Sequence, residues 1–154
     1  MRFIPIDVNK HQNIVVSFRR DSFVVSFGSD KDFGDETDYL DWLKKQTAKN
    51  PKGLVLAFEN ELPIGQLELT IKKYEGKEIG YVNLYYLIPE KRGRGFGTQL
   101  QQYAINFFKN NNVSEYHLRV SPANKQALAF YSKNGLYPIK SEMNGKVIRM
   151  AGCI

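Results

Sequence analysis

The chain contains little that would suit an oxidising or a membrane environment. Its 154 residues include one cysteine, Cys153, so no intrachain disulfide can form. No apolar run approaches the roughly 18 residues of a membrane-spanning helix, and the first residues lack the apolar core of a signal peptide. We therefore expect a cytoplasmic protein with no membrane partner.

Negative charge is also scarce, because 22 lysines and arginines oppose 16 aspartates and glutamates, for a net charge of +6. This balance favours an anionic partner, although a solvated basic surface gives the same total. A nucleic-acid-binding protein would interleave a basic stripe with exposed aromatic residues. The cations here are scattered, apart from Arg19-Arg20 and the run from Lys91 to Arg94. We therefore expect no nucleic acid as partner.

The length suits a single domain over residues 1–154, with no visible repeat or linker. After a short strand at residues 2–4, Asp7 and then Asp35 or Thr37 are candidate N-caps of two helices. Residues 19–28 fit neither the helical nor the strand period. Strand-like segments at residues 53–58, 64–72 and 79–88, with a turn at 74–77, predict an antiparallel meander.

The second half of the chain predicts a crossover and a final hairpin. Residues 100–108 carry an apolar helical stripe, and residues 116–120 alternate as a strand that should lie parallel to residues 79–88. Asn124 caps another helix, which ends at Gly135, and strands near 138–142 and 146–150 flank a turn. The predicted fold class is mixed α/β (α+β): a mostly antiparallel central sheet of six to seven strands with one parallel pair, flanked by about four helices.

The turn at residues 89–98 is the most informative stretch, because it joins a strand to an amphipathic helix. Gly93, Gly95 and Gly97 let the backbone approach a ligand without a Cβ in the way. The turn amides and the positive end of the helix dipole then meet at one place, which suits an anion. The spacing matches neither a P-loop nor the dinucleotide fingerprint. Three cations border the turn: Lys91, Arg92 and Arg94.

This turn resembles the acetyl-coenzyme A motif of the GNAT superfamily of N-acetyltransferases. The motif reads Arg/Gln-x-x-Gly-x-Gly/Ala, and the run from Arg92 to Gly97 satisfies it. The run from Asn124 to Tyr137 is similar to the family's Asn-x-x-Ala-x-x-x-Tyr-x-x-x-Gly-Phe element, with Leu136 inserted before the aromatic residue. The resemblance, specific over residues 81–137, implies a GNAT-like fold and an acetyltransferase that uses acetyl-coenzyme A and no metal.

The resemblance also implies which residues bind the cofactor. Leu87 and Ile88 would pair with the pantetheine arm as an added strand, and an amide near Ile88 would form an oxyanion hole. Asn124 would bind polar groups of the arm as well as cap its helix. Tyr131 would protonate the leaving thiolate, with plain core packing as its alternative. The residues expected to hold the pyrophosphate through their amides are Arg92, Gly93, Arg94, Gly95, Phe96, Gly97 and Thr98.

The implied reaction is direct attack of a primary amine through a tetrahedral intermediate, and the amine must first lose a proton. Glu68 is the best candidate for the base, since it lies on the strand face opposite the apolar residues; a solvated strand residue is the alternative. Glu142 is a weaker candidate. His11 and His117 fit surface or core positions better than a catalytic base.

The acceptor groove of the family is built from the first helices and the loops over the sheet. Phe23 and Phe27 would line it here, with a buried connector as the alternative. Tyr81, Asn83 and Tyr85 alternate along the central strand and would present polar groups to the acceptor. Polyamines, aminoglycosides, amino acids, peptide N-termini and protein lysines all fit. A non-catalytic acyl-coenzyme A-binding module is the alternative function, and homodimers are common among relatives.

Overall fold

A seven-stranded sheet forms the centre of the protein, and the computed structural model describes all residues, 1–154. The strand order is β1-β2-β3-β4-β5-β7-β6, in which β4 and β5 are the parallel pair. This mixed sheet with four α-helices confirms the predicted fold class. The elements are β1 (Arg2–Pro5), α1 (Val8–Phe27), α2 (Glu36–Lys49), β2 (Leu54–Glu59), β3 (Leu62–Tyr74), β4 (Lys77–Leu87), α3 (Phe96–Asn110), β5 (Glu115–Val120), α4 (Lys125–Lys133), β6 (Tyr137–Glu142) and β7 (Val147–Cys153).

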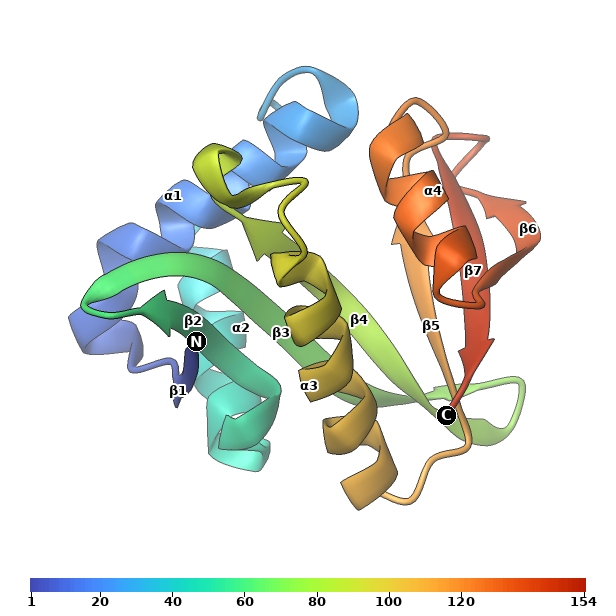
Figure 1. Ribbon diagram of the computed structural model, residues 1–154, viewed down its shortest axis with the longest axis horizontal. Coiled ribbons are helices and arrows are strands. Elements are labelled where there is room, and N and C mark those ends of the chain that lie inside the picture. The colour runs from blue at the N-terminus through green and yellow to red at the C-terminus, as the bar shows by residue number, and fades with distance from the viewer.

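Helices cover both faces of the sheet (Figure 1). α1 and α2 lie behind the N-terminal half, while α3 crosses the front of its middle and α4 lies in front of β5 and β7. Side chains along β2 alternate between the two cores that result. Val55 and Ala57 pack on the α3 side, whereas Leu54 and Leu56 pack on the side of α1 and α2.

The predicted irregular stretch at residues 19–28 is instead the second half of α1. Asp7 caps the helix by accepting hydrogen bonds from two backbone amides, and Gly28 ends it with φ of 81°. The helical period fades because the last turns leave the sheet, so that Val24 and Val25 are 45% and 44% exposed. A segment that faces both a cleft and solvent lacks the single apolar stripe by which a packed helix is recognised.

The meander of β2, β3 and β4 forms as predicted, and the β3–β4 turn has the positive φ angles of a tight hairpin at Glu75 and Gly76. A β-bulge interrupts the β3–β4 ladder. Glu68 pairs with Leu84 while Leu69 pairs with Val82, so β4 carries one extra residue, at Asn83. Beyond the bulge, each side chain of β4 faces the side opposite to the one that a regular strand would give.

β4 and β5 pair over only three positions, residues 80–82 with 116–118. Both strands continue past this contact, β4 to Leu87 and β5 to Val120, and they diverge as they do so (Figure 1). Each strand therefore keeps an unpaired edge on the inside of the split. Asn124 at the start of α4 and the turn before α3 flank this opening.

Candidate functional site

The turn between β4 and α3 has five consecutive backbone amides with no partner in the protein. The N–H groups of residues 93–97 donate to no backbone or side-chain acceptor. Gly93 and Gly95 have φ of 71° and 86°, and such left-handed residues in a turn form concavities that bind anions. Because α3 begins at Phe96, its positive dipole end adds to the attraction. The turn therefore fits a pyrophosphate.

The two ends of the predicted amide series are already occupied. The Arg92 N–H donates to Pro89 O, and the Thr98 N–H donates to Gly95 O, each at 3.2 Å. A short 3-10 turn at Pro89–Lys91 uses the first amide, and the first turn of α3 uses the second. The amides available to a ligand are thus narrowed to those of residues 93–97.

The cations of the turn differ in their availability. Lys91 Nζ binds Glu59 Oε1 at 2.6 Å, and Arg92 Nη2 binds Asp21 Oδ2 at 2.8 Å. Arg94 is exposed and forms no ion pair. Lys91 and Arg92 thus fasten the turn to the rest of the protein, and Arg94 is the side chain left to meet the phosphates.

The unpaired edge of β4 lies beside this turn. The Ile88 N–H donates to Ile64 O on β3 at 2.8 Å, so Ile88 cannot supply the oxyanion hole. Hydrogen-bonding directions alternate along an antiparallel strand, which turns the N–H and C=O of Tyr85 and Leu87 toward the open edge. Leu87 O accepts from Arg92 Nε at 2.8 Å, and the Leu87 N–H faces the split. An extended chain can therefore pair with this edge through Tyr85 and Leu87.

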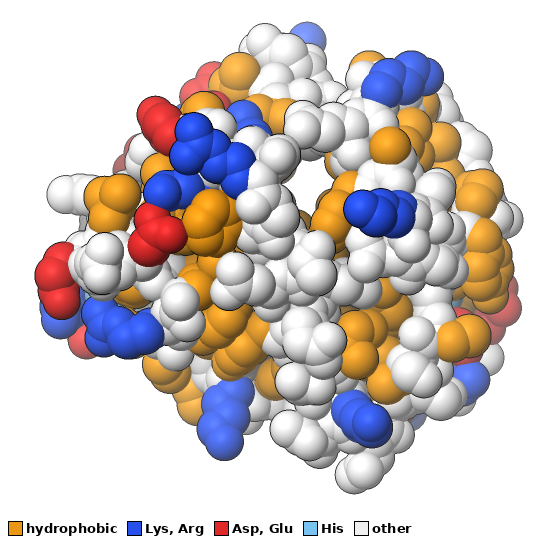
Figure 2. Space-filling model, in the orientation of Figure 1, with side chains coloured by type: hydrophobic (Ala, Val, Ile, Leu, Met, Phe, Trp, Pro, Cys, Tyr) orange, Lys and Arg blue, Asp and Glu red, His pale blue; other side chains and the backbone are white.

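A cleft of about 500 Å³ occupies the split between β4 and β5. Figure 2 shows the molecule hollowed at this place, between the end of α1 and α4. Glu68, Ile88 and the turn residues 93–98 do not border it. Nine residues predicted from the sequence do so: Phe23, Phe27, Tyr81, Asn83, Tyr85, Leu87, Arg92, Asn124 and Tyr131.

Tyr131, on α4, has a hydroxyl group that forms no hydrogen bond with the protein, although its ring packs 6.1 Å from that of Tyr85. Burial, and to a smaller extent Tyr116, raise the pKa of Tyr131, so its proton is kept at neutral pH. A protonated, unpartnered hydroxyl at the wall of a cleft is suited to donate to a ligand.

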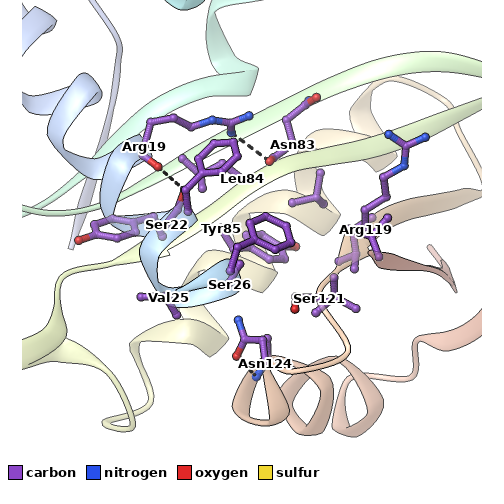
Figure 3. Close-up of a pocket in the computed structure, with 18 of the residues that line it drawn as sticks. Arg19, Ser22, Val25, Ser26, Asn83, Leu84, Tyr85, Arg119, Ser121 and Asn124 are labelled. Atoms are coloured by element: carbon purple, nitrogen blue, oxygen red, sulfur yellow. Dashed lines mark hydrogen bonds between the residues drawn. The ribbon is translucent and has the colours of Figure 1, made fainter. Parts of the chain in front are cut away.

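Asn124 confirms the predicted N-cap of α4 and retains a free donor. Its Oδ1 accepts from the Ala127 N–H at 3.2 Å, which leaves the side-chain amide hydrogens for a ligand. Ser121 lies beside it and accepts from the Ala123 N–H. Figure 3 shows Asn124, Ser121 and Ser26 converging on the same part of the cleft, from opposite walls.

Tyr81, Asn83 and Tyr85, which alternate in the sequence, do not all lie on one face of β4, because the bulge at Asn83 lies between the two tyrosines. Tyr85 faces α3, where its hydroxyl donates to Gln101 Oε1 at 2.7 Å. Tyr81 faces the other side, beside Lys72. All three residues still border the cleft, because it passes through the split in the sheet.

The aromatic residues of α1 lie one turn apart at the opposite wall. Phe23 and Phe27 pack with their ring centroids 5.9 Å apart, and the Arg19 guanidinium lies 5.6 Å from the Phe23 ring. Arg19, Phe23 and Phe27 share a helix face because they are spaced by four residues. Arg19 could not be predicted as a cleft residue from the sequence, because residues 19–28 do not show a clear helical period.

Glu68 is fully buried, which excludes the solvated alternative, and lies behind Arg19 as seen from the cleft. Arg19 Nη1 donates to Glu68 Oε1 at 2.8 Å. It also donates to Asn83 O at 3.2 Å, a hydrogen bond drawn in Figure 3. The hydroxyl of Tyr39 and the side-chain amide of Gln66 donate to Glu68 Oε2. Three donors thus hold the carboxylate away from the ligand space.

The other candidate bases are engaged elsewhere. Glu142 accepts from Arg119 and Arg149; although burial opposes it, these hydrogen bonds hold the pKa of Glu142 below its usual value. His11 accepts from the Asp7 N–H, and His117 lies between Glu115 and Arg149. No group of three or more His, Cys, Asp or Glu side chains is placed to hold a metal ion.

An amide-lined turn, a split parallel strand pair and an unpartnered tyrosine hydroxyl in the cleft together suit a phosphate-bearing ligand with an extended arm. Residues 16–136 match the family model described as Acetyltransferase (GNAT) family, and the chain belongs to that family. An uncharacterized N-acetyltransferase of Methanocaldococcus jannaschii is 30% identical over 100 residues, which are 63% of this chain and 43% of that protein. The chain thus spans less than half of this relative.

Solved structures show the same fold at low identity. The PaiA N-acetyltransferase of Thermoplasma acidophilum, in complex with coenzyme A, has a TM-score of 0.75 and 18% identity, covering 99% of this chain and 98% of that one. A ribosomal-protein-alanine N-acetyltransferase from Brucella melitensis has a TM-score of 0.78 and 12% identity over 100% of both chains. None of the helices here combines the length and apolarity needed to cross a membrane.

Proposed function

We propose that this protein transfers an acetyl group from acetyl-coenzyme A to a primary amine of a small molecule or peptide. The observation that carries the proposal is the unbroken series of free amides at residues 93–97, next to an unpaired strand edge. The first N–H groups of a helix have no intrahelical acceptor, and here the left-handed glycines extend that series of donors into the turn, an arrangement that suits a bound phosphate.

Each part of the cofactor has matching residues in this arrangement. The amides of residues 93–97, with Arg94, would hold the pyrophosphate, and the edge of β4 at Tyr85 and Leu87 would pair with the pantetheine amides. Asn124 would donate to the same arm from the opposite wall. The thioester then lies near Tyr131, in the part of the cleft that both walls border.

The reaction needs one proton delivered and one removed. The neutral amine nitrogen attacks the thioester carbonyl, the C–S bond breaks, and the thiolate takes a proton from the Tyr131 hydroxyl. The acylated nitrogen sheds one proton, which returns to the Tyr131 oxygen through water in the cleft. The raised pKa of Tyr131 keeps that proton available at neutral pH. The Tyr85 N–H, which also faces the split, is placed to donate to the developing oxyanion, while the Tyr85 carbonyl and the Leu87 N–H pair with the arm.

Glu68 enters this proposal through Arg19, whose guanidinium it fixes at the cleft wall. The acceptor ammonium would then lose its proton to water in the cleft. At pH 7 this costs about 4.6 kcal/mol for a lysine-like amine and about 1 kcal/mol for an α-amine. The difference favours an α-amine as acceptor.

The direct test measures coenzyme A binding by calorimetry and thiol release from acetyl-coenzyme A across amino acids, peptides, polyamines and aminoglycosides. We expect binding that Arg94→Ala weakens, and turnover with at least one class of amine. Tight binding without turnover by any amine would support the alternative, a module that senses acyl-coenzyme A. Failure to bind coenzyme A would overturn both.

A further inference from the structure

The acceptor end of the cleft is rich in positive charge that the transfer chemistry does not require. Four cations lie at this end, Lys72, Arg119, Lys140 and Arg149, and the last three surround one carboxylate, Glu142. Arg119 and Arg149 each donate to Glu142, at 2.9 and 3.1 Å, and Lys140 lies 3.6 Å from it. The cluster therefore has an excess of positive charge, and it adjoins the cleft through Lys72 and Arg119.

Two of these cations lie opposite each other on neighbouring strands of the sheet. Arg119 on β5 and Arg149 on β7 are direct cross-strand partners. Like charges at such positions destabilise a sheet, and Glu142 relieves only part of the repulsion. Arg149 is buried, whereas the Arg119 side chain is 41% exposed and borders the cleft. In Figure 3 the guanidinium groups of Arg119 and Arg19 lie on either side of Asn83.

Lys72 is the cation of this end with no carboxylate partner. Its Nζ lies 4.2 Å from the centre of the Tyr81 ring, and it forms no salt bridge. Lys72 is exposed as a residue, but partial desolvation first, and then the charges of Arg119 and Arg149, lower its pKa. An anion placed next to Lys72 would relieve both the desolvation and the repulsion.

The cleft offers little to a cationic acceptor. Asp32 is the one carboxylate that borders it, and Lys146 binds Asp32 Oδ2 at 2.8 Å. The hydrogen bond from Lys146 lowers the pKa of Asp32, which marks the carboxylate as already satisfied. A polyamine or aminoglycoside would thus meet cations at this end, with no free carboxylate to receive it.

We propose that the acceptor amine carries an anionic group, a carboxylate or a phosphate, which binds between Lys72 and Arg119. This inference rests on the proposed function and narrows its acceptor class. Tyr81, with Phe23 and Phe27 on the opposite wall, would hold the part of the acceptor between the amine and the anion.

The test compares acceptors that differ only in the anion. The set consists of tripeptide amides with Glu or Gln at the second or third position, phosphoethanolamine against ethanolamine, and spermidine. Two quantities are measured: kcat/KM from thiol release, and calorimetric binding to protein saturated with coenzyme A, which needs no turnover. We expect the anionic member of at least one pair to be favoured about tenfold in both, and less so at high salt.

Substitutions of Lys72 test whether the preference for anionic acceptors arises from this cluster of cations. Lys72→Met should remove most of the preference, Lys72→Arg should keep it, and Lys72→Glu should reverse it. Lys109→Met, at an exposed position of α3 that borders neither the cleft nor the pocket between Lys72 and Arg119, removes the same charge and should change nothing. A thermal melt of each variant checks folding, although exposed lysine variants should fold normally.

Three results would overturn the inference. The first is equal or better use of the neutral members or of spermidine as acceptors. The second is a preference for anions that survives Lys72→Met and Lys72→Glu. Either result would leave the acetyltransferase proposal intact. The third is that no anionic member of the set binds the coenzyme A-loaded protein. Failure of the acetyltransferase proposal itself would be detected separately, because the protein would then not bind coenzyme A.

Discussion

Arg92 in the amide-lined turn donates from Nη2 to Asp21 Oδ2 on α1 at 2.8 Å, across 71 positions of sequence. The same Asp21 oxygen accepts from the Tyr86 hydroxyl at 2.5 Å, and Arg92 Nε donates to Leu87 O. The turn that would bind pyrophosphate is thereby tied to the helix that lines the acceptor wall.

Removing the ion pair between Arg92 and Asp21 should weaken coenzyme A binding, although Asp21 itself is not proposed to contact the cofactor. We expect Asp21→Asn to raise the Kd for coenzyme A by about two- to fivefold, the range for a partly exposed ion pair that orders a loop. Calorimetry measures the effect. Asp30→Asn, which removes a similar exposed pair with Arg20, is the control and should leave the Kd unchanged. Equal losses in both variants would contradict the role of Asp21.

Gly95 has φ of 86°, and a Cβ built there would meet no atom within 4 Å. Gly95→Ala should therefore destabilise the fold through backbone strain alone, by about 1 kcal/mol, and also disturb the amides that a ligand needs. Gly34 has the same φ of 86° and equally open surroundings. Gly34→Ala should lower the free energy of unfolding similarly but leave coenzyme A affinity intact, as urea titration and calorimetry would show. A shared loss of affinity would argue against the turn as the cofactor site.

Tyr131→Phe removes a hydroxyl that no other group of the protein uses. We expect kcat to fall by about 10²- to 10⁴-fold, the range for loss of a general acid, with little change in stability or in coenzyme A affinity. Tyr103→Phe, which removes a hydroxyl that donates to Lys52 O on the surface, should leave kcat unchanged. An unaltered kcat in Tyr131→Phe would remove this residue from the mechanism.

The free energy of unfolding should decrease in mild acid partly because His11 becomes protonated. Burial, and then the charge of Lys10, lower the pKa of His11 below its usual value of about 6.5. The unfolded chain therefore binds this proton first as the pH falls, so the stabilisation is complete above about 6.5 and is lost below it. We expect Tm to fall more steeply from about pH 7.5 to about pH 5.5 in the wild type than in His11→Asn. Parallel slopes would show that His11 stays neutral or titrates equally in both states.

The local features of this protein could be predicted from its sequence because each depends on residues close together in the chain. Asp7, Asp35 and Asn124 cap their helices as predicted, since a capping side chain reaches only the next two or three amides. The glycines of the turn before α3 predicted its shape for the same reason. Residues 19–28 were misjudged because a helix that leaves the core no longer shows its period.

The chain by itself determined the antiparallel meander, the parallel strand pair, the caps and the glycine turn, and through two spaced motifs its likeness to a family. Tertiary structure alone decided that Glu68 lies buried behind Arg19, that a bulge at Asn83 reverses the side chains of β4, and that Arg119 faces Arg149. These relationships join strands and helices distant in sequence. They are fixed by register and packing, in which a shift of one residue moves every side chain to the other face.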